Sequence, residues 1–131
     1  MAFTVQQLFN RVIGMLGIEA ANATTYLASF PQQTNVVITD CFKIENTNRV
    51  WKKLVELTTI PTVTALVDSI DYQEELMQIL ANGLAMFLSL SDDETIKTQF
   101  YNSQYEESKA KANKMNPKAI VDYFSAEDVT L

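Results

Sequence analysis

The chain has 131 residues and a formal net charge of −6, from ten Lys and Arg against sixteen Asp and Glu. This length predicts one domain, 1–131, with one modest core, and an apolar content of 47% argues against wholesale disorder. The acidic balance excludes a uniformly basic nucleic-acid binder, and the scarcity of glycine and proline (three each) favours helices over an all-β fold.

The cysteine and histidine content further narrows the classes of function that the chain can have. Cys41 is the single cysteine, so no intrachain disulfide can form, and there is no histidine. The start, Met-Ala-Phe-Thr, lacks the pattern of a signal peptide, and the longest apolar run is shorter than the roughly 20 residues of a membrane span. We therefore expect no membrane partner and assembly in a reducing cytosol.

The first helix has the clearest pattern. Thr4 and Gln7 form a predicted capping box, and Gly17 fits a stop after the last turn. The apolar positions follow the helical period: Val5, Leu8, Phe9, Val12, Ile13 and Leu16. Residues 18–34 are less regular and predict a connection with a short helical turn.

A second, long helix is predicted from Thr34 or Asn35 to about residue 58. Its apolar stripe alternates steps of four and three: Val37, Cys41, Ile44, Asn48, Trp51, Val55 and Thr58. The run "ENTN" at 45–48 is a poor helix former, so a strand at 35–44 followed by a helix from Asn46 or Thr47 is the alternative.

An extended arm is predicted at 58–67, "TTIPTVTALV", where threonines and β-branched residues surround Pro61. The arm is either an extended segment or a small hairpin. Because one strand cannot form a sheet alone, it must pair with another part of this chain or with a neighbour.

The third and fourth helices form a predicted antiparallel pair. The third begins near Asp68–Asp71, with a capping box at 71–74, and is apolar nearly all round, which predicts a central helix buried on several sides. A second capping box, 91–94, is expected to open the fourth helix, which runs on the surface to about Met115.

The C-terminal tail, 117–131, is short and still apolar, with Ile120, Tyr123 and Phe124. A disordered tail usually has fewer such residues. It is expected to dock either on its own domain or on a neighbouring subunit.

No catalytic constellation is present in the sequence. There is no glycine-rich phosphate loop, Cys41 has no histidine to activate it, and the acid pairs at 74–75 and 92–93 suit helix starts. We predict that the protein is not an enzyme and uses no metal or cofactor. Trp51 is expected in the core or at an interface.

The lysines near the end of the fourth helix complement its dipole, and they also define a possible DNA-facing basic patch. These are Lys109, Lys111, Lys114 and Lys118.

The stretch 71–114, "DYQEELMQILANGLAMFLSLSDDETIKTQFYNSQYEESKAKANK", resembles the C-terminal half of the small head–tail connector (adaptor) proteins of tailed bacteriophages. The matching positions are an apolar helix, a short acidic turn and an aromatic second helix: Tyr72, Leu76, Leu80, Ala81, Leu84 and Ala85, then 92–94, then Phe100, Tyr101, Tyr105, Glu106 and Ala112. The tail "NPKAIVDYFS" is similar to the segment that follows the family's last helix.

The resemblance implies a small helical bundle of about four helices that forms a homo-oligomeric ring, commonly twelvefold, below the portal of the virion neck. Such a ring joins head to tail, lines the DNA channel with at most non-specific DNA contact, and forms in the host cytoplasm. Arm and tail in this family reach the portal or an adjacent subunit, which implies interface roles for Ile60, Val63, Ile120, Tyr123 and Phe124.

Two other functions stay open at this point. One is another neck or tail-completion ring protein, or a minor capsid-associated protein. The other is a small helical adaptor or regulator unrelated to virions, which the acidic surface permits.

Overall fold

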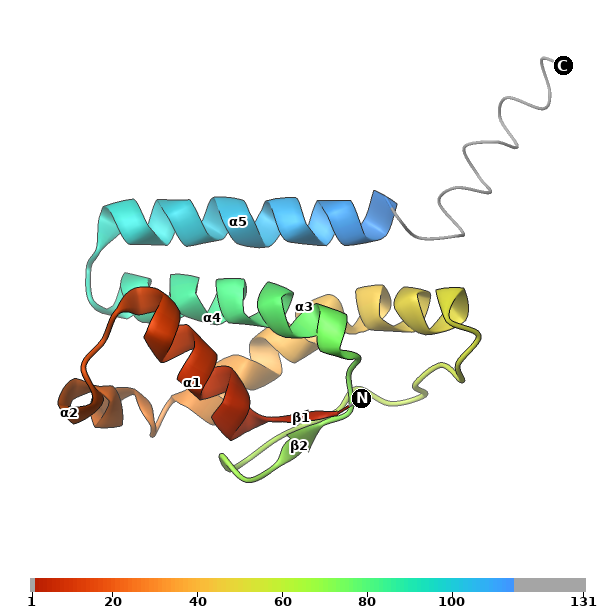
Figure 1. Cartoon of the computed structure of the whole chain (residues 1–131), viewed down its shortest axis with the longest axis horizontal. Coiled ribbons are helices and arrows are strands. Elements are labelled where there is room, and N and C mark those ends of the chain that lie inside the picture. The colour runs from red at the N-terminus through yellow and green to blue at the C-terminus, as the bar shows by residue number, and fades with distance from the viewer. Residues whose placement is uncertain (1, 115–131) are drawn as a thin grey trace, which may run out of the picture.

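The computed structural model describes residues 2–114, and the predicted tail at 117–131, with Ile120, Tyr123, Phe124 and Lys118, lies outside this range. The fold is mainly helical, as predicted (Figure 1). In chain order the elements are β1 (Phe3–Thr4), α1 (Val5–Leu16), α2 (Ala20–Ala23), the 3-10 helix η1 (Thr24–Tyr26), α3 (Phe30–Trp51), β2 (Ser69–Ile70), the 3-10 helix η2 (Glu74–Leu76), α4 (Met77–Ser91) and α5 (Thr95–Lys114).

Helix α1 begins with the predicted capping box. The Gln7 amide donates to Thr4 Oγ1 at 3.1 Å, and the Thr4 amide donates to Gln7 Oε1 at 2.9 Å. Two further amides of the first turn, on Val5 and Gln6, donate to the carbonyls of Asp68 and Leu66. The strand pair β1–β2, antiparallel with Phe3 opposite Ile70, brings these carbonyls to the helix N-terminus.

Helix α3 is one continuous helix, so the strand-plus-helix alternative is wrong. It begins four or five residues earlier than predicted, at Phe30, because Pro31 suits a first helical turn. It also ends earlier, at Trp51, where Lys53 adopts a left-handed conformation with φ 60°. The Leu54 amide then donates back to the Arg49 carbonyl, which closes the helix end.

Helices α1 and α4 end in the same way, with a residue in the left-handed conformation followed by an amide that donates back into the last turn. The left-handed residues are Gly17 in α1 and Asp93, with φ 56°, in α4. At the end of α4, the Glu94 amide donates to the Ser89 carbonyl and the Asp93 amide to the Leu90 carbonyl. The predicted capping box at 91–94 is therefore wrong. Ser91 still belongs to α4, and α5 begins at Thr95.

The predicted start of the third helix at 68–71 is also wrong, because α4 begins at Met77. Asp68 Oδ2 instead accepts the amides of Thr64 and Ala65, at 2.8 and 3.0 Å, and closes the turn before β2. The buried Tyr72 anchors the following loop by donating its hydroxyl to the Ile38 carbonyl at 2.7 Å. These contacts hold residues 64–73 outside a helix despite their acids.

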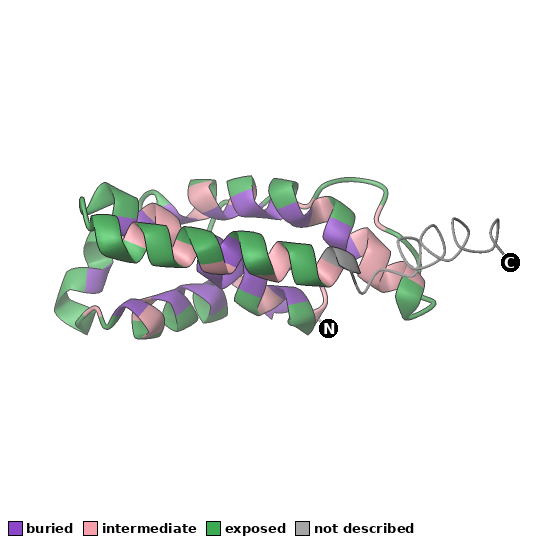
Figure 2. Cartoon of the chain, turned by 90° about the horizontal axis from the view of Figure 1, so that it is seen from above, coloured by how far each residue is buried: buried purple, intermediate pink, exposed green. Residues whose placement is uncertain are grey.

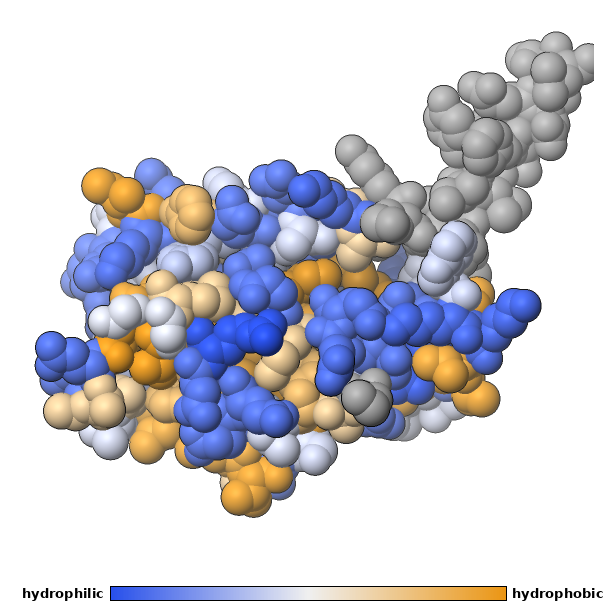
Figure 3. Space-filling model, viewed as in Figure 1, coloured by the Kyte–Doolittle hydropathy of each residue, from blue (hydrophilic) through white to orange (hydrophobic). Residues whose placement is uncertain are grey.

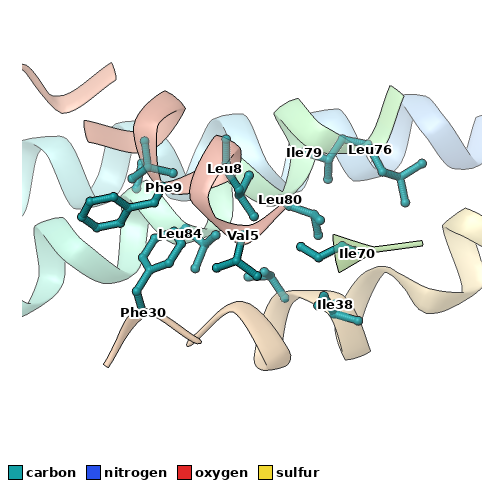
Figure 4. Packing of buried hydrophobic residues seen from close by; sticks show 14 of the residues in the cluster. Val5, Leu8, Phe9, Phe30, Ile38, Ile70, Leu76, Ile79, Leu80 and Leu84 are labelled. Carbon is teal, nitrogen blue, oxygen red and sulfur yellow. The ribbon is translucent and has the colours of Figure 1, made fainter. Parts of the chain in front are cut away.

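Helix α4 is the central helix, as predicted. It lies beside α5 in antiparallel orientation, while α1 and α3 cover its other sides (Figures 1 and 2). Every residue from Ile79 to Ala85 is buried. Phe9 and Phe30 meet edge to face at 4.8 Å, and apolar side chains from α1, α3, α4 and β2 converge around them (Figure 4).

Gly83 is the point of closest approach between α4 and its neighbours. A Cβ atom at this position would lie 2.8 Å from Tyr105 Cε1 on α5 and 2.9 Å from Val37 Cγ1 on α3. Real Cβ contacts are longer than this, so Gly83 permits three helices to pack around one point. Gly14 in α1 has no atom within 4 Å of such a Cβ.

This contrast predicts opposite effects for two glycine-to-alanine substitutions. Gly83→Ala should lower the free energy of unfolding by about 1–2 kcal/mol, because overpacking outweighs the gain in helix propensity. Gly14→Ala should raise it by up to about 1 kcal/mol, because only helix propensity changes. Urea unfolding followed by circular dichroism measures both, and a stabilising Gly83→Ala would contradict the close approach.

Candidate interaction surfaces

The predicted arm is extended and runs back along α3, held by two asparagine side chains. Asn46 accepts the Leu57 amide through Oδ1 at 2.7 Å and donates to the Leu57 carbonyl through Nδ2 at 3.0 Å. Asn35 holds Val63 in the same way, with both distances 2.8 Å. Eleven residues separate the two asparagines, about three helical turns, so both lie on one face of α3.

The two predicted interface residues of the arm have different environments. Val63 is only 2% exposed and belongs to the core of its own chain. Its predicted interface role is therefore not supported in this conformation, because Asn35 fixes its backbone against α3 and its side chain faces the core. Ile60 lies between the two asparagine contacts and is exposed, so it stays available to a partner.

The polar run at 45–48, which looked unfavourable for a helix, supplies the contacts that hold the arm and the loop before α4. The fully buried Glu45 accepts the Gln73 amide at 2.9 Å and Arg49 Nε at 2.5 Å. Arg49 also donates to the carbonyls of Val55 and Asp71. Burial raises the pKa of Glu45, whereas the Gln73 amide and Arg49 oppose that rise.

Exposed apolar side chains gather on the segment that follows this polar network. We call Trp51, Leu54, Val55 and Ile60 the α3–arm strip. Trp51 is 57% exposed and Val55 84%, so the prediction of a core position for Trp51 is wrong and its interface alternative stays a prediction. Other exposed apolar side chains lie elsewhere, and Figure 3 shows separate orange areas at several edges of one face.

The predicted basic patch is largely neutralised where the structure describes it. Lys109 Nζ lies 2.7 Å from Asp40 Oδ2, 3.1 Å from Glu106 Oε1 and 4.2 Å from the centre of the Tyr105 ring. Lys111 is exposed and lies 3.8 Å from Glu107. These pairings reduce the positive field that DNA binding needs. The side chain of Lys114 and all of Lys118 lie outside the described part.

A partly buried cluster links α3 to α5. Tyr105 donates its hydroxyl to Asp40 Oδ2 at 2.6 Å, and the Cys41 sulfur lies 3.7 Å from the same hydroxyl. Lys109 and Tyr105 lower the pKa of Asp40. Burial raises the pKa of the Cys41 thiol to about 11, so this group is a protonated core thiol at neutral pH rather than a nucleophile.

The comparisons with known proteins add no relatives. No family model, curated protein or solved structure matches the chain. Within residues 2–114, none of the helices combines the length and apolar character needed to cross a bilayer. The same part of the chain contains no group of three acidic or cysteine side chains arranged to hold a metal ion.

Sequence reasoning missed the two asparagine contacts, although a signal was present. Asn35 and Asn46 share a helix face and precede an extended segment that lacked a partner. An asparagine amide can pair with one backbone amide and one carbonyl at once, as a β-strand neighbour does. Their spacing could have predicted a helix that binds the arm through side chains.

Replacing Asn46 should release the first half of the arm. In Asn46→Ala, the Leu57 amide and carbonyl lose their partners, and we expect the free energy of local opening there to fall by about 1–3 kcal/mol. Hydrogen exchange at Leu57 measures this, with Asn102→Ala, an exposed α5 position, as control. Unchanged exchange at Leu57 would show that the arm is held by other contacts.

Proposed function

We propose that this protein is a structural subunit of a phage neck, a head–tail connector that forms a ring below the portal. The observation that carries the proposal is the α3–arm strip, which presents a tryptophan and three aliphatic side chains to solvent. Large apolar side chains exposed to solvent mark candidate interaction sites, and tryptophan is enriched among the residues that dominate binding energy.

The way in which the arm is held supports the same proposal. Asn35 and Asn46 bind the arm through its backbone, and the Glu45–Arg49 pair fixes both ends of the connection between α3 and α4. The strip is therefore presented on an ordered scaffold, which lowers the entropy lost when a partner binds. A structural subunit that binds portal or neighbouring subunits needs such a pre-organised surface.

The helical architecture is compatible with the resemblance in residues 71–114. The family resemblance requires an apolar helix followed by an antiparallel surface helix, and α4 and α5 have this arrangement. The strongly acidic chain suits a channel wall from which DNA must leave, since it offers few phosphate contacts.

Two valines provide a matched test of the strip. Val55 is 84% exposed within the strip, and Val67 is 83% exposed in the turn before β2. Val55→Glu should leave folding intact and reduce association with co-expressed portal protein at least tenfold, because it places a charge in an apolar contact. Val67→Glu should preserve association.

Size-exclusion chromatography with light scattering on the co-expressed proteins gives the readout, and circular dichroism checks the fold. A wild-type chain that neither joins the portal nor occurs in purified particles by mass spectrometry would overturn the proposed function. Equal loss of association in both variants would instead remove the strip from the interface.

A further inference from the structure

A polar cleft at one end of the molecule lies between the turn after α1 and the turn between α4 and α5. It encloses about 550 Å³, and three carboxylates reach it from two separate turns: Glu19, Asp92 and Glu94. One lysine, Lys97, also lines it and pairs with Glu94 at 3.2 Å. The lining therefore has net negative charge, larger than the half positive charge of the α5 N-terminus.

Ser89 gives an independent sign that the cleft receives a ligand. This serine lines the cleft, is 1% exposed, and its hydroxyl has no hydrogen-bond partner within the described part of the chain. A buried hydroxyl without a partner costs free energy, and a ligand that reaches it can supply the hydrogen bond. Because a hydroxyl can accept, it suits an N–H donor of the ligand.

The Tyr26 side chain sets the shape of the cleft. Its hydroxyl donates to Asp92 Oδ2, which ties η1 to the α4–α5 turn. This hydrogen bond to a carboxylate raises the pKa of Tyr26, so the tyrosine stays a neutral donor. A ligand therefore meets the exposed carboxylates of Glu19, Asp92 and Glu94, and the buried Ser89 also lines the cleft.

We propose that this cleft binds a lysine ammonium group from the C-terminal end of α5 of a second copy of the chain. Two acids of the cleft, Asp92 and Glu94, lie just before α5, whereas lysines lie in its last turns, and the 20 residues of α5 separate these ends by about 30 Å. Lys111 is 75% exposed and weakly paired, and Lys114 follows one turn later. The acidic turn before α5 and the exposed Lys111 near its end have opposite charges and can pair between copies.

This contact joins the C-terminal end of α5 in one copy to the cleft of the next copy. Because the two surfaces are different, the contact is heterologous. A heterologous contact closes into a ring when the rotation between copies permits it. The inference rests on the proposed ring, but it can be tested with the purified chain alone. Its failure is therefore distinct from a failure to join a portal.

Cadaverine, which reproduces the lysine side chain as a free diamine, is the probe for the cleft. We expect millimolar cadaverine to shift the backbone NMR signals of Glu19, Ser89 and Asp92. Asp92→Asn should weaken this binding at least fivefold, and Asp93→Asn is the matched control, because Asp93 is exposed and does not line the cleft. Equal weakening by both variants, or shifts outside the cleft, would overturn the site.

Ser89→Ala separates a binding role from a structural role. We expect it to weaken cadaverine binding while leaving the unfolding midpoint unchanged or higher, since the hydroxyl makes no hydrogen bond in the described structure. Unchanged binding in Ser89→Ala would remove the hydroxyl from the site.

Charge reversal tests the second copy as the source of the ammonium group. Sedimentation velocity at low salt should show self-association that cadaverine and 0.5 M salt suppress. The pair Glu19→Lys with Asp92→Lys, and the pair Lys111→Glu with Lys114→Glu, should each abolish it. Mixing the two double variants should restore self-association, because the native lysine end of one variant meets the native cleft of the other, and the two charge-reversed surfaces also have opposite charges.

Two results would overturn the assignment to a second copy. One is cadaverine binding without self-association of the wild type, which would identify the cleft as a site for free amines. The other is self-association that survives both charge reversals.

Discussion

The close approach at Gly83 is the constraint on which the rest of this small fold depends. Because this position lacks a Cβ, the ring of Tyr105 can lie against α4, and its hydroxyl can reach Asp40 on α3. Lys109 then lies over the same ring and pairs with Asp40. One missing methyl group therefore lets α3, α4 and α5 share an aromatic contact, a hydrogen bond and an ion pair.

The polar half of α3 holds the long connection between α3 and β2 in an ordered conformation. Residues 54–68 contain no helix or strand, yet their backbone is bound at Leu57 and Val63 by asparagines. The buried Glu45 and its neighbour Arg49 extend this binding to Val55, Asp71 and Gln73. Poor helix formers are tolerated in α3 because their side chains form the backbone hydrogen bonds that a neighbouring strand would otherwise provide.

Much of this architecture could be predicted from periodicity and capping chemistry. The apolar stripe of α1, the capping box at Thr4 and the burial of α4 are local or nearly local properties, and the structure confirms all three. The errors came from residues whose partners are distant in sequence. Acids at 68–74 suited a helix start, but a strand partner at Phe3 and the Glu45 carboxylate hold this segment in another conformation.

The same reasoning explains why the predicted interface was only partly accessible to sequence analysis. Ile60 and Val63 both follow the pattern of an unpaired apolar arm, and composition cannot separate them. The separation comes from register: Asn35 fixes Val63 so that its side chain enters the core, whereas Ile60, three residues earlier, lies on the outer side.

Because the asparagines bind backbone groups, the arm side chains between them are not needed to hold the arm in place. Their chemistry can change without loss of the scaffold, which is the property expected of a surface that is shaped by its partner. Backbone attachment of an extended segment thus separates the stability of the fold from the specificity of its contacts.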